Sequence, residues 1–314
     1  MKKKELASSN LPAESILLTQ DEIYNQTVQL INSAQKSIYV EQGVFADDRL
    51  SQLLISKSKS GLDVRVLLDQ FQTANRTTLN ELKNNQVSAQ FYPARKGQYD
   101  HVKLLVVDYS QAIVYSSNWS SDGWNAANMA VLLKDKTAWK LANIVYSRDW
   151  EFTTTLSLNV PKTTSLTEDN ITPATTANIR QQITEQISSS SRSIWIEATE
   201  VSDKDTILTL TNAASKGRDV RILLDANKAK STPVILEQLK SAGVQVRFYK
   251  EKNNQPLGFN LGIFDGNTFI FSSSGWSYLT FFNNHELSLT VPSPAATTKL
   301  IQTFDTDWQN GSST

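Results

Sequence analysis

Polar and apolar positions along the chain change period in a regular order. Apolar residues recur three or four positions apart over residues 21–35 and 49–60, which is the spacing of amphipathic helices. Short apolar runs follow each of these stretches, at 37–42 and 64–68. Continuous apolar runs of that length are typical of buried strands. The pattern predicts helices that alternate with strands, as in an α/β sandwich.

The same order of elements is expected in both halves of the chain. In the first half, a third helix at 77–84 precedes a strand at 87–92, a hairpin-like pair of strands at 103–107 and 112–115, and a closing helix at 137–152. In the second half, the helices are expected at 177–188, 205–216, 233–242 and 295–309, and the strands at 193–198, 220–224, 244–249, 261–264 and 268–271.

These parallels indicate a tandem duplication, because five sequence matches recur in order at a nearly constant offset. The offset is 156 at the first match (193 − 37) and 158 at the last (307 − 149). The matched segments are 37–41 with 193–197, 63–69 with 219–225, 91–92 with 248–249, 116–119 with 273–276, and 149–150 with 307–308. The expected division is a flexible N-terminus (1–12), a first domain (13–155), a threonine-rich linker (156–176) and a second domain (177–314).

Length and charge narrow the class of protein. A chain of 314 residues fits two domains of ordinary size. Lysine and arginine together number 31, as do aspartate and glutamate, so nucleic acid is the less expected partner. The absence of cysteine excludes disulfides and thiolate metal sites. No apolar run is long enough to span a bilayer, so we expect a soluble chain, either cytoplasmic or exported with its signal segment missing.

The candidate chemistry of the first half lies in its expected hairpin. His101 and Lys103 are two residues apart, so they project from one face of an extended chain. Ser116 and Asn118 are spaced in the same way after the next strand, and pairing of the strands would bring all four to one rim. A lone His-x-Lys pair is more often a solvated strand end, but the matching Ser-x-Asn favours a phosphate pocket. Histidine can attack phosphorus or move a proton, and Asp108 either orients the imidazole or fixes the turn.

The pattern His-x-Lys-x4-Asp followed by Ser-x-Asn, in a duplicated α/β chain, resembles the phospholipase D superfamily. The resemblance implies two α/β/α sandwich domains related by a pseudo-two-fold axis, which cleave or exchange phosphodiesters with no metal and no other cofactor. It implies that one histidine forms a phosphohistidine and a second acts as general acid. His101 would be one of these, with Lys103 and Asn118 at the phosphate and Ser116 behind them. Asp108 belongs to the catalytic motif in the same way, mainly as a structural residue.

The second half departs from this pattern. Gly258 stands in place of the histidine, Asn260 in place of the lysine and Gly275 in place of the asparagine. Ser273 and Asp265 survive. By the resemblance, we expect Asn260 and Ser273 still to face the phosphate and Asp265 to support the site. A missing general acid is serious, because such a group typically contributes about 10²–10⁴-fold in rate.

A carboxylate that would support the site is present in the second half of the chain and absent from the first. The superfamily often carries Asn-x-Glu after the serine–asparagine strand, with the glutamate supporting a catalytic histidine. The segment reads Asn284-His285-Glu286 in the second half and Asn128-Met129-Ala130, without a carboxylate, in the first. We expect Asn128 and Glu286 in supporting positions. His285 is the chain's other histidine, but if Glu286 faces the site, its strand neighbour His285 faces away.

Aromatic residues follow the Ser-x-Asn positions of both halves: Trp119, Trp124, Trp276 and the segment 278–282. They suit an apolar entrance for an acyl chain or a stacked base, or else a hydrophobic lid packed against protein. A small basic loop, Arg95-Lys96-Gly97, precedes His101 and is either a steering element or simply solvated.

The half-intact motif leaves three functions open. The first is a phosphodiesterase or phosphatidyltransferase with a histidine nucleophile, acting as a monomer on a phospholipid in contact with a membrane surface. The second is a pseudoenzyme that binds phosphate or phospholipid without turnover. The third is a nuclease or DNA binder on the same fold, which the balanced charge disfavours.

Overall fold

The computed structural model describes residues 7–162, 166–229 and 233–313. Leu17–Glu168 forms one compact unit, which contains the first repeat, and the described residues on either side of it form the other. The units therefore divide later than the expected first-domain boundary. Ser9, in the expected flexible N-terminus, donates its backbone N–H to Pro292 O in the second unit at 2.7 Å; residues 1–6 of that segment lie outside the described residues.

The first unit is built on a seven-stranded mixed sheet with the order β1-β7-β6-β5-β2-β3-β4. Strands β2, β3 and β4 are parallel, whereas β5, β6 and β7 form an antiparallel meander beside β2. The strands are β1 (Ile16–Leu17), β2 (Ser37–Gln42), β3 (Asp63–Asp69), β4 (Ser88–Tyr92), β5 (Leu104–Val107), β6 (Gln111–Tyr115) and β7 (Ala130–Lys134). The helices of this unit are α1 (Gln20–Ser33), α2 (Asp48–Lys59), α3 (Asn75–Asn84), α4 (Ser121–Trp124), α5 (Asp135–Lys140), the π-helical η2 (Leu141–Tyr146) and α6 (Ser147–Thr154). The short helix η1 (Ala13–Ser15) precedes β1 and belongs to the other unit.

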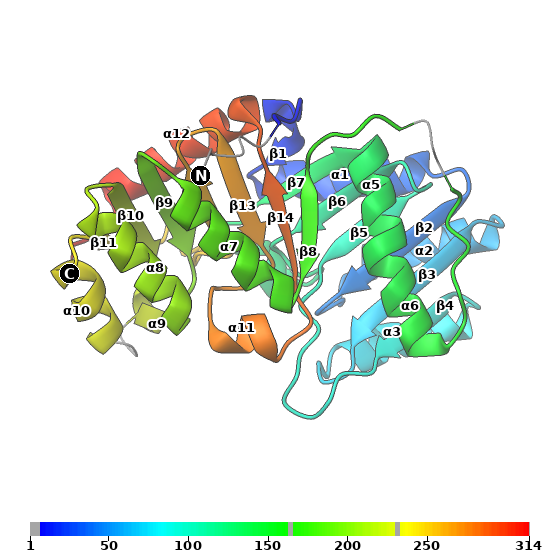
Figure 1. The fold of residues 1–314 in the computed structure, drawn as a ribbon. Coiled ribbons are helices and arrows are strands. Elements are labelled where there is room, and N and C mark those ends of the chain that lie inside the picture. The colour runs from blue at the N-terminus through cyan, green and yellow to red at the C-terminus, as the bar shows by residue number, and fades with distance from the viewer. Residues whose placement is uncertain (1–6, 163–165, 230–232, 314) are drawn as a thin grey trace. The chain divides into compact units, whose positions relative to one another are not determined.

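Helices cover both faces of this sheet (Figure 1). On one face, apolar side chains of α1, α2 and α3 pack against β2 and β3 in a single buried cluster. On the other face, Tyr39 of β2 stacks on Tyr146 at 5.0 Å between ring centroids, and Arg65 of β3 lies 5.1 Å over the ring of Trp150. Strands buried on both faces explain why β2 and β3 read as continuous apolar runs.

The second unit repeats the arrangement, with the sheet order β11-β10-β9-β12-β13-β14-β8. Helices α7, α8 and α10 supply the buried cluster on one face, and Phe304 of α12 stacks on Trp195 at 5.4 Å on the other. The strands are β8 (Thr172–Thr175), β9 (Ser193–Ala198), β10 (Asp219–Leu224), β11 (Gln245–Phe248), β12 (Asn260–Phe264), β13 (Thr268–Ser272) and β14 (Leu287–Val291). The helices are α7 (Ala177–Ser189), α8 (Lys204–Ser215), α9 (Ala226–Ala229), α10 (Pro233–Ser241), α11 (Tyr278–Phe282) and α12 (Pro294–Asn310).

The expected fold class, two tandem α/β sandwiches, is confirmed. The hairpin strands β5 and β6 pair in antiparallel register, as do β12 and β13. Part of the expected linker is itself a strand, because β8 pairs with β14 at the edge of the second sheet. Within the part of the chain that the structure describes, no helix has both the length and the apolar character needed to cross a bilayer.

Candidate functional site

The segment that carries His101 lies immediately before β5, at one end of the first sheet. The His101 ring stacks on Tyr99, with ring centroids 5.7 Å apart and planes within 4° of parallel. Lys103 is buried, and its Nζ donates to the backbone carbonyl of His101 at 3.0 Å. The structure therefore brings His101 and Lys103 together, although both lie just before the strand.

The hairpin places Ser116 and Asn118 at the same end of the sheet. Beyond the last ladder pair, Tyr115 N donates to Lys103 O at 3.0 Å, which continues the β5–β6 pairing towards these residues. The Asn118 side chain is held by the end of β2, because its Oδ1 accepts from Val44 N at 3.1 Å. The residues of the expected phosphate pocket thus lie on adjacent chain segments in the first repeat.

Ser116 is tied to the next strand through its hydroxyl. Its Oγ lies 3.1 Å from Asn128 Oδ1 and accepts from Met129 N at 3.0 Å. The Asn128 amide in turn donates to Gly123 O at 2.8 Å. These bonds place Asn128 behind Ser116, where we expect a supporting residue.

A buried aspartate at the end of β3 holds the backbone that leads into His101. Asp69 accepts from Asp100 N at 2.5 Å through Oδ2. Asn75, also fully buried, donates to the backbone carbonyls of Asp69 and Gly43 at 2.8 Å each. Buried side-chain–backbone bonds of this kind fix a loop that has no ladder of its own. They position the residue next to His101 without touching its imidazole.

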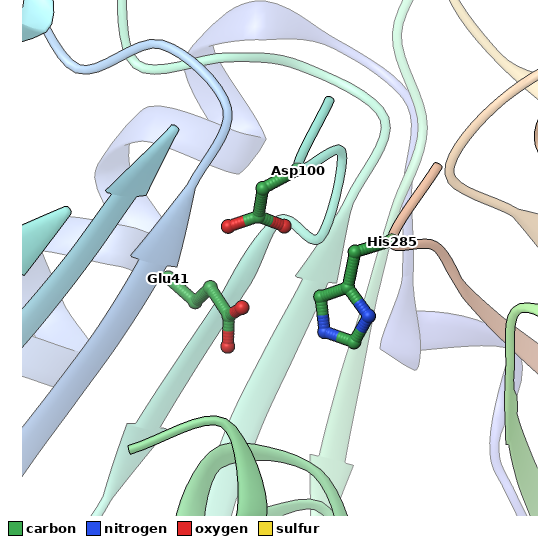
Figure 2. Close-up of side chains that lie close together, drawn as sticks. All are labelled: Glu41, Asp100 and His285. Carbon is green, nitrogen blue, oxygen red and sulfur yellow. The ribbon is translucent and has the colours of Figure 1, made fainter. Parts of the chain in front are cut away.

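Three carboxyl side chains gather beside this loop. Glu41 of β2, Asp100 and Asp149 of α6 are all buried. Figure 2 shows the Glu41 and Asp100 carboxyl groups turned towards one another. Burial raises the pKa of Glu41 well above its ordinary value, and the charges of Asp149 and Asp100 and hydrogen bonds to them raise it further. The raised pKa favours the protonated form of Glu41, which reduces the repulsion among the three carboxyl groups.

The second repeat keeps the core of this arrangement. Glu197, at the position of Glu41, is fully buried beside Asp307, at the position of Asp149. Burial raises the pKa of Glu197 well above its ordinary value, with further upward contributions from Asp307, while Lys252 acts in the opposite direction. Lys252 forms an ion pair with Asp307. A carboxyl pair under the sheet is thus common to both repeats, including the one that lost the histidine.

We expect Glu197→Gln to change how stability depends on pH. A carboxyl group whose pKa is raised by folding contributes stability that is complete below its unfolded pKa, near 4.5, and is lost as pH rises through the folded pKa. Glutamine stays neutral, so the unfolding free energy of the wild type should fall relative to that of the variant as pH rises above 4.5. Urea unfolding from acid to alkaline pH measures this difference, with the exposed Glu237→Gln as control. Parallel curves for wild type and Glu197→Gln would contradict the expectation.

Asp108 lies at the opposite end of β5 from His101. Its Oδ1 accepts from the backbone N–H groups of Lys36 and Ser37 at 2.8 Å each, and its Oδ2 accepts from Gln35 N at 2.9 Å. Four strand residues separate it from the Lys103 segment. Of the two alternatives for Asp108, these bonds favour fixing the turn over orienting the imidazole.

Asp265 repeats the same anchor in the second unit. Its carboxylate accepts from the backbone N–H groups of Ser191, Arg192 and Ser193 at 2.7–3.1 Å. Partial burial acts to raise the pKa of Asp265, but these hydrogen bonds outweigh it and hold the pKa below its ordinary value. The anchor survives in a repeat without the histidine, so it serves the fold of each repeat.

Asp108→Ala is expected to destabilise the first repeat and to leave chemistry intact. The change leaves three backbone N–H groups without their carboxylate at a partly exposed turn, a loss of about 2 kcal/mol in unfolding free energy. Chemical denaturation measures this loss, with Asp265→Ala as the matched change in the second repeat. A variant that stays folded and stable yet loses turnover would return Asp108 to the catalytic residues.

We call the His101, Lys103, Ser116 and Asn118 region the half-site of the first repeat, and its counterpart around Gly258, Asn260, Ser273 and Gly275 the half-site of the second. In the second repeat, side chains fill this space. Asn260, at the position of Lys103, is buried, and its Oδ1 accepts from both N and Oγ1 of Thr199 at 2.9 Å. Asn260 therefore uses its amide oxygen inside the fold. We expected Asn260 to face a phosphate, but its hydrogen bonds to Thr199 favour a structural role.

Small and large residues have changed places between the two half-sites. In the first repeat, Gly43 faces Asn118, and a Cβ on Gly43 would lie 3.0 Å from Asn118 Oδ1. In the second repeat, Thr199 stands at the position of Gly43 and faces Gly275, where a Cβ would lie 2.9 Å from Thr199 Oγ1. The threonine thus fills space that an asparagine at position 275 would need.

The strand register corrects one alignment made from the sequence. Ser273 Oγ donates to Glu286 and accepts from Leu287 N at 3.1 Å, as Ser116 does with Asn128 and Met129. Asn128 therefore occupies the position of Glu286, and the expected match of Glu286 with Ala130 is wrong by two residues. The stretch from Ser273 to Glu286 is one residue longer than the stretch from Ser116 to Asn128, and this length difference hid the match.

His285 lies in the segment before β14, not on the strand. The prediction that His285 faces away from the site assumed that side chains alternate along a strand, so it does not apply to this segment. Its neighbour Asn284 donates through Nδ2 to Glu286 Oε1 at 3.3 Å, so this segment is tied to the serine–glutamate pair of the second repeat.

The aromatic residues that were expected either at an apolar entrance or in a packed lid differ in their burial. Trp119 and Trp276 are completely buried and Trp124 is 5% exposed, so these rings belong to the cores of their repeats. Tyr278 and Phe282 are 66% and 43% exposed, which leaves the 278–282 segment as an apolar surface. The basic loop at residues 95–97 is exposed to solvent.

Asp69 and Glu41 were not recognised from the sequence as parts of the site. Both ended matched segments of the duplication, where they served only as evidence of the repeat. A carboxylate repeated at the end of a buried strand is itself a signal, because an ionisable group at such a position needs a partner. Asn75 and Asp100 carried no comparable signal, since neither is repeated in the second half.

Two α/β repeats, one with His-x-Lys and Ser-x-Asn at the end of its hairpin and one with their remnants, define a phospholipase D-like protein. The family model described as "Cardiolipin synthase, PLD-like domain" matches residues 27–150 and again residues 183–308. The chain belongs to this family.

One relative in sequence and two solved structures of similar fold are as follows. A "Phospholipase D" of Rickettsia prowazekii (strain Madrid E) is 29% identical over 126 residues, which cover 39% of this chain and 58% of the relative. The phosphatidylserine synthase of Haemophilus influenzae Rd KW20 has a similar fold, with a TM-score of 0.74, 14% identity, and coverage of 95% of this chain and 87% of that one. The polyphosphate kinase of Porphyromonas gingivalis matches with a TM-score of 0.68, 14% identity, and coverage of 98% and 49%.

Proposed function

We propose that this protein is a phosphodiesterase or phosphatidyltransferase that uses His101 as its nucleophile and takes a phospholipid as substrate. The observation that carries the proposal is the first repeat's rim, where His101, Lys103, Ser116 and Asn118 lie at one end of the β5–β6 hairpin. Membership of a cardiolipin synthase-like family supports the phospholipid class. The zero formal charge supports it against a nuclease, because phosphate-backbone binding draws on many lysines and arginines.

The proposed chemistry has two steps. An imidazole nitrogen of His101 attacks phosphorus, the bond from phosphorus to the leaving alcohol breaks, and that oxygen takes up a proton from solvent water. Water or a second alcohol then attacks the phosphohistidine, the bond from phosphorus to nitrogen breaks, and the proton of the attacking group passes to solvent. This step releases His101 and gives hydrolysis or transfer. Lys103 and Asn118 provide the positive charge and the amide donor for the phosphate oxygens in both steps. Histidine suits both steps because it is a nucleophile at neutral pH.

A phosphate-binding pseudoenzyme is the second candidate, and the filled half-site of the second repeat favours it. Thr199 and Asn260 bond to each other where the family would place a second lysine. Such a protein would keep the pocket around Lys103 and lose turnover.

Covalent trapping separates the two candidates. The purified protein is mixed with a chromogenic phosphodiester or with short-chain phosphatidylcholine, quenched rapidly, and weighed as the intact protein. We expect an acid-labile phosphoryl or phosphatidyl adduct that His101→Ala does not form. Absence of both adduct and product, together with phosphate binding that Lys103→Ala weakens, would replace the enzyme with the pseudoenzyme.

A further inference from the structure

Helix α11 presents an unusual amount of apolar surface for five residues. Tyr278 is 66% exposed, Leu279 57% and Phe282 43%. Helix α11 follows β13 in the chain (Figure 1). Ser273 and Gly275 lie in the segment between the two elements. Large apolar side chains exposed side by side mark interaction surfaces more often than isolated ones do.

The duplication supplies a matched comparison, because α4 is the same turn in the first repeat. Ser120 caps α4 by accepting from Gly123 N at 3.1 Å, and Ser277 caps α11 by accepting from Thr280 N at 3.4 Å. Each turn buries one aromatic residue, Trp124 or Phe281.

The two turns differ in what they show to solvent. The exposed positions of α4 carry Ser121, Asp122 and Asn125, and the corresponding positions of α11 carry Tyr278, Leu279 and Phe282. The first repeat proves that this turn forms with polar residues at all three positions. Folding therefore does not require the apolar residues of α11, and their presence calls for an apolar partner.

We propose that α11 is a membrane-contact turn whose Tyr278, Leu279 and Phe282 side chains enter the interfacial layer of a phospholipid bilayer. The inference deepens the proposed function and rests on it, since a phospholipid substrate lies in such a layer. It assigns to the second repeat, with its filled half-site, the role of holding the protein on the substrate's surface.

The residue types on and beside α11 fit a bilayer interface. Tyrosine combines an apolar ring with a polar hydroxyl, and such side chains concentrate at the level of lipid headgroups. Arg180 of α7 lies with its guanidinium 4.5 Å over the Phe282 ring, so an apolar surface is bordered by a cation. Arg180 is also paired with Asp205 at 2.7 Å. With that charge compensated and a net charge of zero, attachment would depend on apolar insertion more than on anionic lipid.

The absence of native cysteine allows a site-specific optical test. Leu279→Cys is labelled with an environment-sensitive dye and titrated with phosphatidylcholine vesicles in low and high salt. We expect a blue-shifted, brighter emission at both salt concentrations. The matched control is Leu208→Cys, which places the dye at a 55% exposed leucine of α8 and should not respond. Equal responses at both positions, or none at Leu279→Cys, would overturn the proposal.

A second variant tests the turn without a label. Tyr278→Ser, Leu279→Asp and Phe282→Asn together give α11 the exposed residues of α4, so the fold should be kept. We expect vesicle binding by flotation to weaken at least about tenfold, because the inserted apolar groups are removed. Vesicle binding equal to that of the wild type would overturn the proposal. A wild-type dimer that this variant converts to a monomer would replace the bilayer with a second copy of the chain.

The failures of the two proposals can be told apart. If the soluble phosphodiester gives a His101-dependent adduct but vesicles give no response, only the proposal of a membrane-contact turn is overturned. If Leu279→Cys responds to vesicles but no adduct forms, the proposal of an enzyme is overturned and the membrane-contact turn is still supported.

Discussion

His101→Ala should lower turnover of a phosphodiester at least about a thousandfold, since it removes the group that forms the covalent intermediate. Lys103 and Asn118 remain in the variant, so substrate binding should persist. The expected signature is therefore a collapse of kcat with a much smaller change in KM. Steady-state kinetics on a chromogenic phosphodiester measures both constants.

The matched control is His285→Ala, which removes the chain's other histidine. If one histidine carries the reaction, this variant should keep turnover within about twofold of the wild type. A collapse of kcat in both variants would instead assign one histidine to attack and the other to proton donation. The slope of kcat against the pKa of the leaving alcohol would then separate the two variants, because a missing acid penalises poor leaving groups most.

The sequence predicted the elements that its periodicity describes. Buried strands such as β2 and β3 read as apolar runs, and the helices between them show clear spacing. The edge strand β8 was taken for linker because threonine and proline fit an edge strand and a loop equally well. Strands β7 and β14 were missed although their burial resembles that of the others. Neither of them lies within one of the five matched segments that revealed the duplication.

The sequence predicted the part of the site whose residues lie close together along the chain, but not the contacts between distant residues. His101 and Lys103 immediately precede β5, and Ser116 and Asn118 immediately follow its hairpin partner β6, so spacing along the chain was enough to predict that they lie together. The Asp69–Asp100 bond joins the end of one strand to a loop 31 residues later, and no local pattern marks such a contact. The equivalence of Asn128 and Glu286 was hidden by one additional residue, which only the register of the paired strands reveals.

Restoring the lost asparagine in the second repeat should destabilise the protein. In Gly275→Asn, the new Cβ would lie 2.9 Å from Thr199 Oγ1 and Glu200 Cβ, and 3.0 Å from Glu200 N. Backbone atoms cannot yield cheaply, so we expect a loss of about 3 kcal/mol in unfolding free energy. Gly217→Asn is the control: a Cβ there meets nothing within 4 Å, and asparagine tolerates the left-handed conformation at a helix end.

The exchange of small and large residues makes a sharper prediction for the double variant. Thr199→Gly places glycine where the first repeat has Gly43, so it should relieve the part of the clash in Gly275→Asn that involves Thr199 Oγ1, while the contacts with Glu200 remain. Each single change is expected to destabilise. Thr199→Gly loses the hydrogen bond from Thr199 Oγ1 to Asn260, whereas the bond from the backbone N–H remains. The loss of unfolding free energy in the double variant should be smaller than the sum of the two single losses by about 1–2 kcal/mol, because the two positions are in contact. If urea unfolding shows that the two losses are additive, positions 199 and 275 are not coupled. The exchange of small and large residues would then not explain why the second half-site is filled.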